Sequence, residues 1–196
     1  MAVPLADEAL DRAFRTARTF NGYRDEPVTE ADLRAIWDLM KWGPTSANQE
    51  PLRIAWCVSQ ESKDKLAQFC SGQNAPKVRA APVTAILAMD MEFYEKLPRL
   101  FPHTDARAWF LGNDSLIQES AFRNSTLQGA YFIIAARMLG FDTGPMSGFD
   151  TPKVTEAFFG GTTYKANFIS TLGYGDPASV QARLPRLDFE EVNQLL

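Results

Sequence analysis

Two basic segments, one toward each end of the chain, carry side chains that could bind an anion. Arg18, Thr19 and Asn21 place a guanidinium, a hydroxyl and an amide close together near the expected end of the first helix. Toward the C-terminus, Arg183 and Arg186 could hold a phosphate group through parallel hydrogen bonds. Each segment also has an ordinary structural interpretation, because arginine and asparagine often cap helices or lie solvated at the surface.

A third segment is a turn rich in short polar side chains. Pro44, Thr45, Ser46 and Asn48 belong to a cluster of turn-forming residues that would connect a helix to a strand. Small residues here would also let the backbone approach a flat ring, while Ser46 and Asn48 hydrogen-bond its polar edge. Composition alone favours the simpler interpretation, a helix-to-strand connection.

A fourth segment combines proline and glycine with backbone amides that could be free. Pro145, Met146, Ser147 and Gly148 follow an expected strand at Phe141 and precede an expected helix start. The amides of Met146, Ser147 and Gly148 could then point at a ligand. A tight turn accounts for this segment equally well.

Few side chains could carry out chemistry without help. His103 is the only histidine, which leaves too few ligands for a zinc site and argues against a Ser-His-Asp triad. Cys57 and Cys70 have no CxxC spacing, so we expect buried or incidental free thiols. No metal site is expected, and any enzyme chemistry should come from a bound cofactor.

Charge and hydropathy argue against several classes of protein. The formal net charge is -4, with acidic and basic residues interleaved along the chain, so no nucleic-acid partner is expected. No apolar run approaches the roughly 20 residues of a membrane span, and residues 1–7 carry no targeting signal. We therefore expect a cytoplasmic protein whose partners are small molecules or a second copy of itself.

The pattern of elements predicts a single domain over residues 1–196, in which helices accompany a few buried strands. One helix should begin at Thr29, whose spacing to Asp32 is typical of a capping box, and should end at Gly43. The other expected elements are helices over residues 7–18 and 62–70, strands over 53–58, 83–89 and 167–173, an irregular helical excursion over 91–112, a loop over 142–149, and a short helix that begins at residues 150–152.

The longest expected helix runs from Asp114, a potential N-cap, to Gly140. At 1.5 Å per residue it would be roughly 40 Å long, which exceeds what one small domain needs for its own core. Residues 129–136 are apolar nearly all round, so we expect a homodimer in which a second subunit covers part of this helix. The expected continuous face consists of Ile117, Ala121, Asn124, Leu127, Tyr131, Ile134 and Met138.

Taken together and in this order, the four segments resemble the nitroreductase family. Its members carry an R-[RS]-S-x-R-x-F helix end, a P-S-S-x-N-x-Q-P turn, a glycine-bearing loop after the long central helix, and a C-terminal arginine. The similarity covers nearly the whole chain. Four runs, at residues 41–48, 121–125, 142–150 and 182–187, are most similar to the Rut-type malonic semialdehyde reductase subgroup of pyrimidine catabolism.

The resemblance implies an α+β, nitroreductase-like fold with a central, mostly antiparallel sheet flanked by helices. It implies an intertwined homodimer with a long central interface helix and a C-terminal tail exchanged onto the partner. Two FMN molecules would lie at the interface between the subunits.

The same resemblance implies which residues bind FMN. Arg18 and Thr19 match the first FMN motif, and either Arg183 or Arg186 matches the tail arginine on the phosphate. The flavin ring would meet two further sets of residues, namely a turn from the partner beneath it (Pro44, Thr45, Ser46 and Asn48) and a loop over its N5 and O4 edge (Pro145, Met146, Ser147 and Gly148).

Three positions depart from the family pattern. Asn21 stands where a second basic residue is usual, which removes a positive charge from the N1 and O2 edge of the flavin. Glu50 replaces the usual glutamine, and a carboxylate there would oppose the charge of a reduced flavin unless it turns away. Leu52 replaces a frequent tryptophan, which should change packing more than chemistry.

The reaction implied by the resemblance is hydride transfer from NADPH or NADH to a small electrophile. Flavin N5 would carry the hydride, so no side chain is required as acid or base. Malonic semialdehyde, reduced to 3-hydroxypropionate, is the first candidate acceptor. A broad-specificity nitroreductase or quinone reductase is the alternative, and a non-redox flavin- or ligand-binding module is the third.

A semialdehyde carboxylate would need a cation near the flavin, and the excursion over residues 91–112 could supply one beside aromatic side chains. The alternative is that its arginines lie in solvent and its aromatic residues form a local core. The candidate substrate residues are Phe93, Arg99, His103, Arg107, Trp109 and Phe110.

Overall fold

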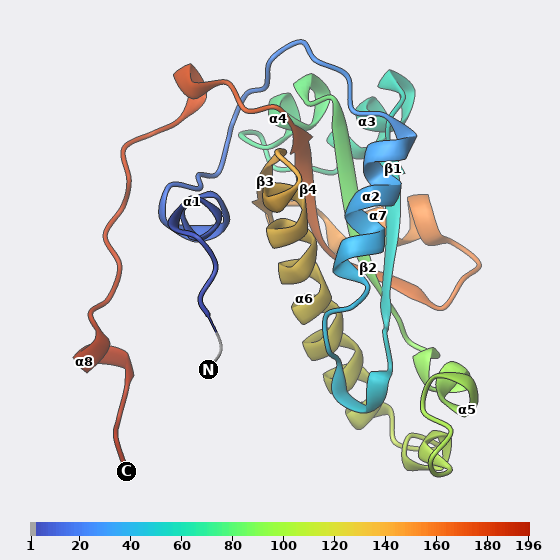
Figure 1. Ribbon diagram of the computed structural model, residues 1–196. Coiled ribbons are helices and arrows are strands. Elements are labelled where there is room, and N and C mark those ends of the chain that lie inside the picture. The colour runs from blue at the N-terminus through green and yellow to red at the C-terminus, as the bar shows by residue number, and fades with distance from the viewer. Residues whose placement is uncertain (1–2) are drawn as a thin grey trace.

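The protein is built on a four-stranded antiparallel sheet with helices on both faces (Figure 1). A computed structural model describes residues 3–196, and the strands follow the order β1-β2-β4-β3. Every neighbouring pair in this sheet is antiparallel. The expected α+β fold with a flanked antiparallel sheet is therefore confirmed. The strands are β1 (Leu52–Cys57), β2 (Val83–Asp90), β3 (Asp142–Met146) and β4 (Tyr164–Gly173).

Two of the helices begin at the caps expected from the sequence. Thr29 and Asp32 form a capping box, in which each side chain accepts a hydrogen bond from the backbone N–H of the other residue. Asp150 accepts a bond from the Lys153 N–H at the start of α7. One face of the sheet is covered by α2 (Glu30–Met40) and α6 (Asp114–Met138), and the other by α3 (Gln60–Ala67), α4 (Ala75–Ala80) and α7 (Thr151–Phe159).

The central strand β2 is covered on both faces. All eight of its residues are buried. Ala85 and Leu87 belong to the hydrophobic cluster with α2 and α6, whereas Ile86 and Ala88 belong to the cluster with α3, α4 and α7. Because successive side chains of a strand point to opposite faces, this one apolar run contributes to both layers.

The first helix begins at Asp7 as the sequence predicts but ends at Arg15, so the expected end at residue 18 was wrong. It consists of α1 (Asp7–Leu10) and a π-helical turn (Asp11–Arg15), which ends where the Thr16 N–H bonds back to the Asp11 carbonyl. Arg18 and Thr19 therefore follow the helix, and Thr19 forms a parallel bridge with Thr143.

Two other boundaries also differ from the predictions. The expected loop over residues 142–149 begins as strand β3, because residues 142–146 pair along β4. The N-cap of α6 is Asn113, whose side chain accepts a hydrogen bond from the Leu116 N–H, and Asp114 is the first helical residue. Helix α4 was not predicted, since only six residues form it and Pro76 stands in its first turn.

The buried face of α6 departs from the expected one in its second half. The row expected to continue through Leu127 instead passes through Gln128 and Phe132, because these positions face the sheet. Leu127 and Met138 remain 42% and 40% exposed. An apolar flank of α6 is therefore left uncovered by the chain's own core.

Two irregular parts lie outside the sheet and its covering helices. The excursion over residues 91–112 consists of three short helices, η3 (Phe93–Lys96), α5 (Leu97–Leu100) and η4 (Ala106–Trp109). The C-terminal tail leaves the sheet through η5 (Pro177–Ser179), runs extended past α1 and ends beyond α8 (Phe189–Val192) (Figure 1). None of the helices within residues 3–196 combines the length and the apolar character needed to cross a membrane.

Close packing of α6 on the sheet makes Gly129 sensitive to substitution. A Cβ atom there would come within 2.5 Å of the Phe168 ring. We expect Gly129→Val to lower the free energy of unfolding by about 2 kcal/mol, because an overpacked core must shift. Urea denaturation measures the change. Gly72→Ala is the matched control, since nothing lies within 4 Å of its added Cβ, and a loss equal to that of Gly129→Val would contradict the packing.

Candidate functional site

Two segments far apart in the sequence line one basic groove of about 700 Å³. Both the segment around Arg18 and the C-terminal tail line it. The candidate phosphate ligands predicted near the two ends of the chain therefore lie in one groove. We call this feature the cationic groove. Its lining residues are Phe14, Arg15, Ala17, Arg18, Thr19, Asn21, Lys77, Arg137, Gln181, Ala182, Arg183, Leu184 and Arg186.

Four side-chain hydrogen bonds tie the tail to the N-terminal segment, one of them from the Ser179 hydroxyl to the Gly22 carbonyl at 3.2 Å. The Arg18 guanidinium donates to the Gln181 carbonyl, and the Arg183 guanidinium donates to the Ala17 carbonyl at 3.1 Å. The Asn21 amide donates to the Ser179 carbonyl at 3.1 Å. Asn21, one of the candidate flavin ligands, thus uses one N–H of its side-chain amide to hold the tail.

Three cations of the groove were missed by sequence reasoning, and only Arg15 lies close in the chain to a predicted ligand. The other two come from distant helices. Lys77 comes from α4 and Arg137 from the last turn of α6, and neither lies in a motif. A basic residue in the last turn of a long helix was the only available signal, and it is an ordinary one. Tertiary packing alone brings both side chains beside Arg18.

The groove holds more positive charge than its own chain neutralises. Arg15 pairs with Asp7 and Asp11. The other five cations have no carboxylate within 4 Å in the part of the chain that is described; they are Arg18, Lys77, Arg137, Arg183 and Arg186. Such a groove is suited to an anion of high charge density, such as a phosphate group.

Arg137 is the most strongly desolvated of these cations. Its Nη1 donates to the Ala13 carbonyl at 3.0 Å, but its buried Nε has no partner within residues 3–196. Burial lowers the pKa of Arg137 from its usual range, although nearby Asp142 opposes the effect. An anion in the groove would supply the negatively charged partner that this guanidinium lacks.

The turn that contains Ser46 lies at the other half of α6. The Ser46 N–H donates to the Asn124 side-chain oxygen at 2.8 Å. The Asn48 amide donates to the Leu100 carbonyl of the excursion at 3.0 Å. The Tyr131 hydroxyl donates to the Pro44 carbonyl at 2.9 Å.

The described lining of the cationic groove includes no residue of this turn. Ser46 is fixed at Asn124, 13 residues before Arg137 along α6, and Pro44 is fixed at Tyr131, six residues before it. At 1.5 Å per residue these spacings are about 20 Å and about 9 Å. The candidate residues therefore fall into two groups, Arg18 with the tail and the Ser46 turn with the excursion.

The predicted loop at residues 145–148 is half strand and half loop. Pro145 and Met146 pair with Ser170 and Ile169 in the sheet, so they are strand residues. The amides of the next two residues donate no hydrogen bond within the described chain. Those residues, Ser147 and Gly148, line a second cavity of about 420 Å³ with Gln68, Phe69, Cys70, Ser71, Phe149, Asp150 and Lys153.

Gly148 is required by the close approach of a neighbouring loop. Its carbonyl accepts bonds from the Ser71 N–H at 2.9 Å and from the Asn74 amide at 3.1 Å. A Cβ at this position would lie 2.8 Å from the Ser71 hydroxyl oxygen and 2.7 Å from the Asn74 side chain. Asn74 was not predicted as a site residue, and its position places an amide beside the candidate loop.

Two of the candidate substrate residues are core residues. Phe93 and Phe110 are 0% and 5% exposed, and their rings pack edge to face at 4.9 Å. They belong to a cluster that joins the excursion to the start of α6. Both rings therefore pack in the core of this chain, and their contact with a substrate stays a prediction.

The other aromatic and basic candidates of the excursion lie nearer the surface. Arg107 donates two bonds of 2.7 Å to Glu95, and this pairing raises its pKa. Trp109 is 50% exposed and packs on Phe101, which also contacts the His103 ring at 5.3 Å. Arg107 is thus engaged with a carboxylate of its own chain.

No group of three potential metal ligands gathers anywhere in residues 3–196. Cys57 is buried and Cys70 half-buried, and both are free thiols. The described residues offer a cationic groove, free amides and a polar turn.

Comparison with known proteins assigns this arrangement to a family. Residues 14–174 match the model of the nitroreductase family, so the chain belongs to the nitroreductase family. A protein of Burkholderia lata is 56% identical over 97% of this chain and 98% of its own length. A Stenotrophomonas maltophilia protein is 55% identical over 100% of both chains. Each relative is provisionally described as an NADH dehydrogenase/NAD(P)H nitroreductase.

Solved structures show the same fold at low sequence identity. A provisionally described nitroreductase of Exiguobacterium sibiricum, in complex with FMN, has a TM-score of 0.85 at 18% identity and covers 100% of both chains. YdfN of Bacillus subtilis, described in the same provisional way, has a TM-score of 0.85 at 19% identity, covering 97% of this chain and 100% of its own. The likeness extends over the whole described fold.

The two thiols should be nearly inert in the folded protein. Burial raises the pKa of Cys57 to about 11 and also raises that of Cys70. Since the thiolate is the reactive form, we expect Cys57 to react with a disulfide reagent at pH 8 at least roughly a hundredfold more slowly than in urea, with the rate rising toward pH 11. Cys70→Ser isolates this rate. Equal rates in folded and unfolded protein would contradict the burial.

Proposed function

We propose that this protein binds FMN and uses it to transfer hydride from NADPH or NADH to a small electrophile. The observation that carries the proposal is the cationic groove, in which Arg18 and the tail arginines meet without a carboxylate partner in the described chain. The FMN complex of the structural neighbour and the NAD(P)H nitroreductase names of the two relatives support it.

The residues of the groove fit the phosphate of FMN. Arg137 lines the groove with a partly desolvated guanidinium, and a bound phosphate would stabilise its charge. Arg18, Arg183 and Arg186 would hold the phosphate, and Thr19 would add a hydroxyl donor. The free amides of Ser147 and of Gly148 would serve the polar edge of the ring.

A homodimer would complete this site. The groove and the turn of Pro44, Thr45, Ser46 and Asn48 are separate in the described chain, which supports a site in which one subunit supplies the groove and its partner the turn. Exposed apolar side chains on α2, directly after α2 and on α6 support an interface there, because a lone chain would leave them in water. They include Leu39, Trp42, Phe122, Leu127 and Met138.

The C-terminal tail supports the same assembly. Its apolar side chains have no core to join in a single chain, and an exchange onto a partner would bury them. Leu184 is 74% exposed, Leu187 68% and Phe189 58%. The tail would thus carry its arginines and its apolar residues into one shared structure.

Bound FMN would supply the hydride chemistry, and the chain's own residues would bind, orient and exclude water. Malonic semialdehyde is the proposed acceptor, because the chain resembles the reductases of pyrimidine catabolism. Arg107 is engaged with Glu95, so the semialdehyde carboxylate would fall to Arg99 or His103. Trp109 packs on the same Phe101 ring as His103. A broad nitroreductase or quinone reductase is the second candidate, since the names of the relatives specify no semialdehyde.

Removal of the central cation of the groove should release the cofactor. We expect Arg18→Ala to raise the dissociation constant of FMN by about tenfold to a hundredfold, which corresponds to one charge-assisted phosphate contact. Fluorescence titration of the apoprotein measures it, with exposed Arg34→Ala as the control. Arg183→Ala and Arg186→Ala tested in parallel show which tail arginine contributes. An unchanged constant for Arg18→Ala would contradict the proposed phosphate site.

The acceptor can be assigned by steady-state turnover. With saturating NADPH, we expect kcat/KM for malonic semialdehyde to exceed that for a nitroaromatic or a quinone by at least about tenfold. Arg99→Met should then raise KM for the semialdehyde and leave that for the nitroaromatic unchanged. A semialdehyde rate no greater than the nitroaromatic rate would favour the broad reductase.

A further inference from the structure

The turn between α2 and β1 is held in an unfavourable backbone conformation. Ala47, Asn48 and Glu50 have φ angles of 47°, 49° and 41°, which lie in the left-handed region that side chains with a Cβ rarely adopt. Between them, Gln49 is 1% exposed, and neither polar atom of its amide has a partner within the described chain. Contacts from the rest of the structure must therefore impose this shape.

One end of the turn is fixed by α6 and the excursion, through the bonds of Ser46 to Asn124 and of Asn48 to Leu100. These bonds do not reach Glu50. Within the turn, the Glu50 N–H donates to the Thr45 hydroxyl at 3.2 Å, and the Glu50 carbonyl is held by a side chain of β1.

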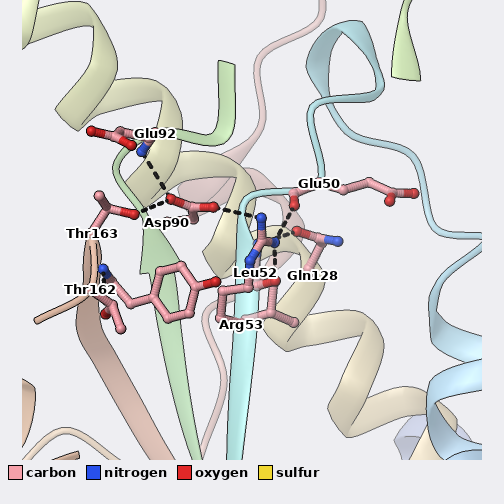
Figure 2. A network of polar contacts seen from close by, with 9 residues as sticks. Glu50, Leu52, Arg53, Asp90, Glu92, Gln128, Thr162 and Thr163 are labelled. Carbon is pink, nitrogen blue, oxygen red and sulfur yellow. Dashed lines mark hydrogen bonds and ion pairs between the residues drawn. The ribbon is translucent and has the colours of Figure 1, made fainter. Parts of the chain in front are cut away.

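Arg53 supplies this side chain (Figure 2). Its Nη1 donates to the Glu50 carbonyl at 3.0 Å and to the Leu52 carbonyl at 2.8 Å, while its Nη2 donates to the Asp90 carboxylate at 2.6 Å. The planar guanidinium thus links the end of the turn to the end of β2 in a fixed geometry. Figure 2 shows the Glu50 carboxylate directed away from Arg53 and Asp90.

Asp90 is itself rigidly anchored. Its side chain is 4% exposed, and its Oδ1 accepts bonds from the Glu92 N–H at 2.9 Å and the Thr163 hydroxyl at 2.7 Å. Its own N–H donates to the Pro51 carbonyl at 2.8 Å. The guanidinium carbon of Arg53 lies over the Tyr164 ring, 5.5 Å from the ring centroid. Arg53 therefore has one available orientation.

The position of this ion pair indicates more than a contribution to stability. A buried carboxylate and a partly buried guanidinium lose hydration, so such a pair is a weak source of stability compared with apolar side chains of similar size. What the pair does specify is geometry, because both terminal nitrogens of Arg53 and both carboxylate oxygens of Asp90 are hydrogen-bonded. That geometry fixes the carbonyl of Glu50, directly after the candidate flavin-contacting residues.

The geometry points to Arg53, held by Asp90, as a positioning residue that fixes the left-handed turn of residues 46–50 in the shape presented to the flavin ring in the partner subunit. This inference rests on the proposed function. It assigns Arg53 an effect on the ring portion of FMN and none on the phosphate, because the turn and the cationic groove lie at different parts of α6.

The test compares FMN with riboflavin, which has the same ring and lacks the phosphate. Arg53→Met, Arg53→Lys and Asp90→Asn are measured with wild type by fluorescence titration of the apoprotein, and Arg34→Met is the matched control because its ion pair with Glu30 is exposed. We expect Arg53→Met to weaken both flavins by the same factor of about ten and to move the visible spectrum of bound FMN toward that of free FMN.

Arg53→Lys should restore much of the affinity, since an ammonium can still bond Asp90 and one carbonyl. Asp90→Asn should raise the dissociation constants of both flavins several-fold. If Arg53→Met does not fold, Asp90→Asn and Arg53→Lys provide the test in its place. Thermal unfolding and sedimentation monitor folding and assembly. A folded Arg53→Met variant with wild-type affinities and spectrum would overturn the inference, as would a loss confined to FMN. Failure of wild type to bind FMN would instead overturn the proposed function.

Discussion

Burial of β2 on both faces forces helices onto each side of the sheet, because a strand without a water-exposed face must be covered twice. On one side this cover is α6, which is longer than the sheet needs and meets different parts of the chain along its length. Asn124 holds the strained turn, and Arg137 contributes to the cationic groove. The same strand ends in Asp90, the anchor of Arg53. The spacing of the functional groups thus follows from how one strand is covered.

Local signals in the sequence predicted much of this fold and less of the site. The caps at Thr29 and Asp150 depend on side chains adjacent in the chain, so spacing alone identifies them. The order of four segments likewise indicated the nitroreductase family. Lys77 and Arg137 could not be predicted, because only tertiary packing brings them to the groove. Phe93 was ambiguous, since an aromatic residue in a stretch without regular period can belong to a core or to a surface.

Unneutralised cations in a groove have an energetic consequence for the chain that carries them. Like charges repel, so the arginines of the tail are repelled by the other cations of the groove. This repulsion acts against the hydrogen bonds that hold the tail in place. An anion that binds there removes the repulsion and stabilises the folded form by mass action. The strained turn shows the same principle in the backbone, where packing from α6 and Arg53 maintains a conformation that its own residues disfavour. Both features trade local stability for a defined arrangement of polar groups.

The contact between Arg18 and Gln181 joins residues 163 positions apart. Closing so long a loop costs more chain entropy than forming a contact between residues that are close in the sequence. Contacts of this kind form late when a protein folds. During synthesis, Arg18 emerges before the first strand, whereas Gln181 and Arg183 emerge after all four. The sheet and its helices can therefore assemble while the groove does not yet exist. A chain cut before Gln181 would keep the residues of the sheet and its covering helices and lack the tail residues that line the groove, so completion of the groove is a step separate from formation of the core.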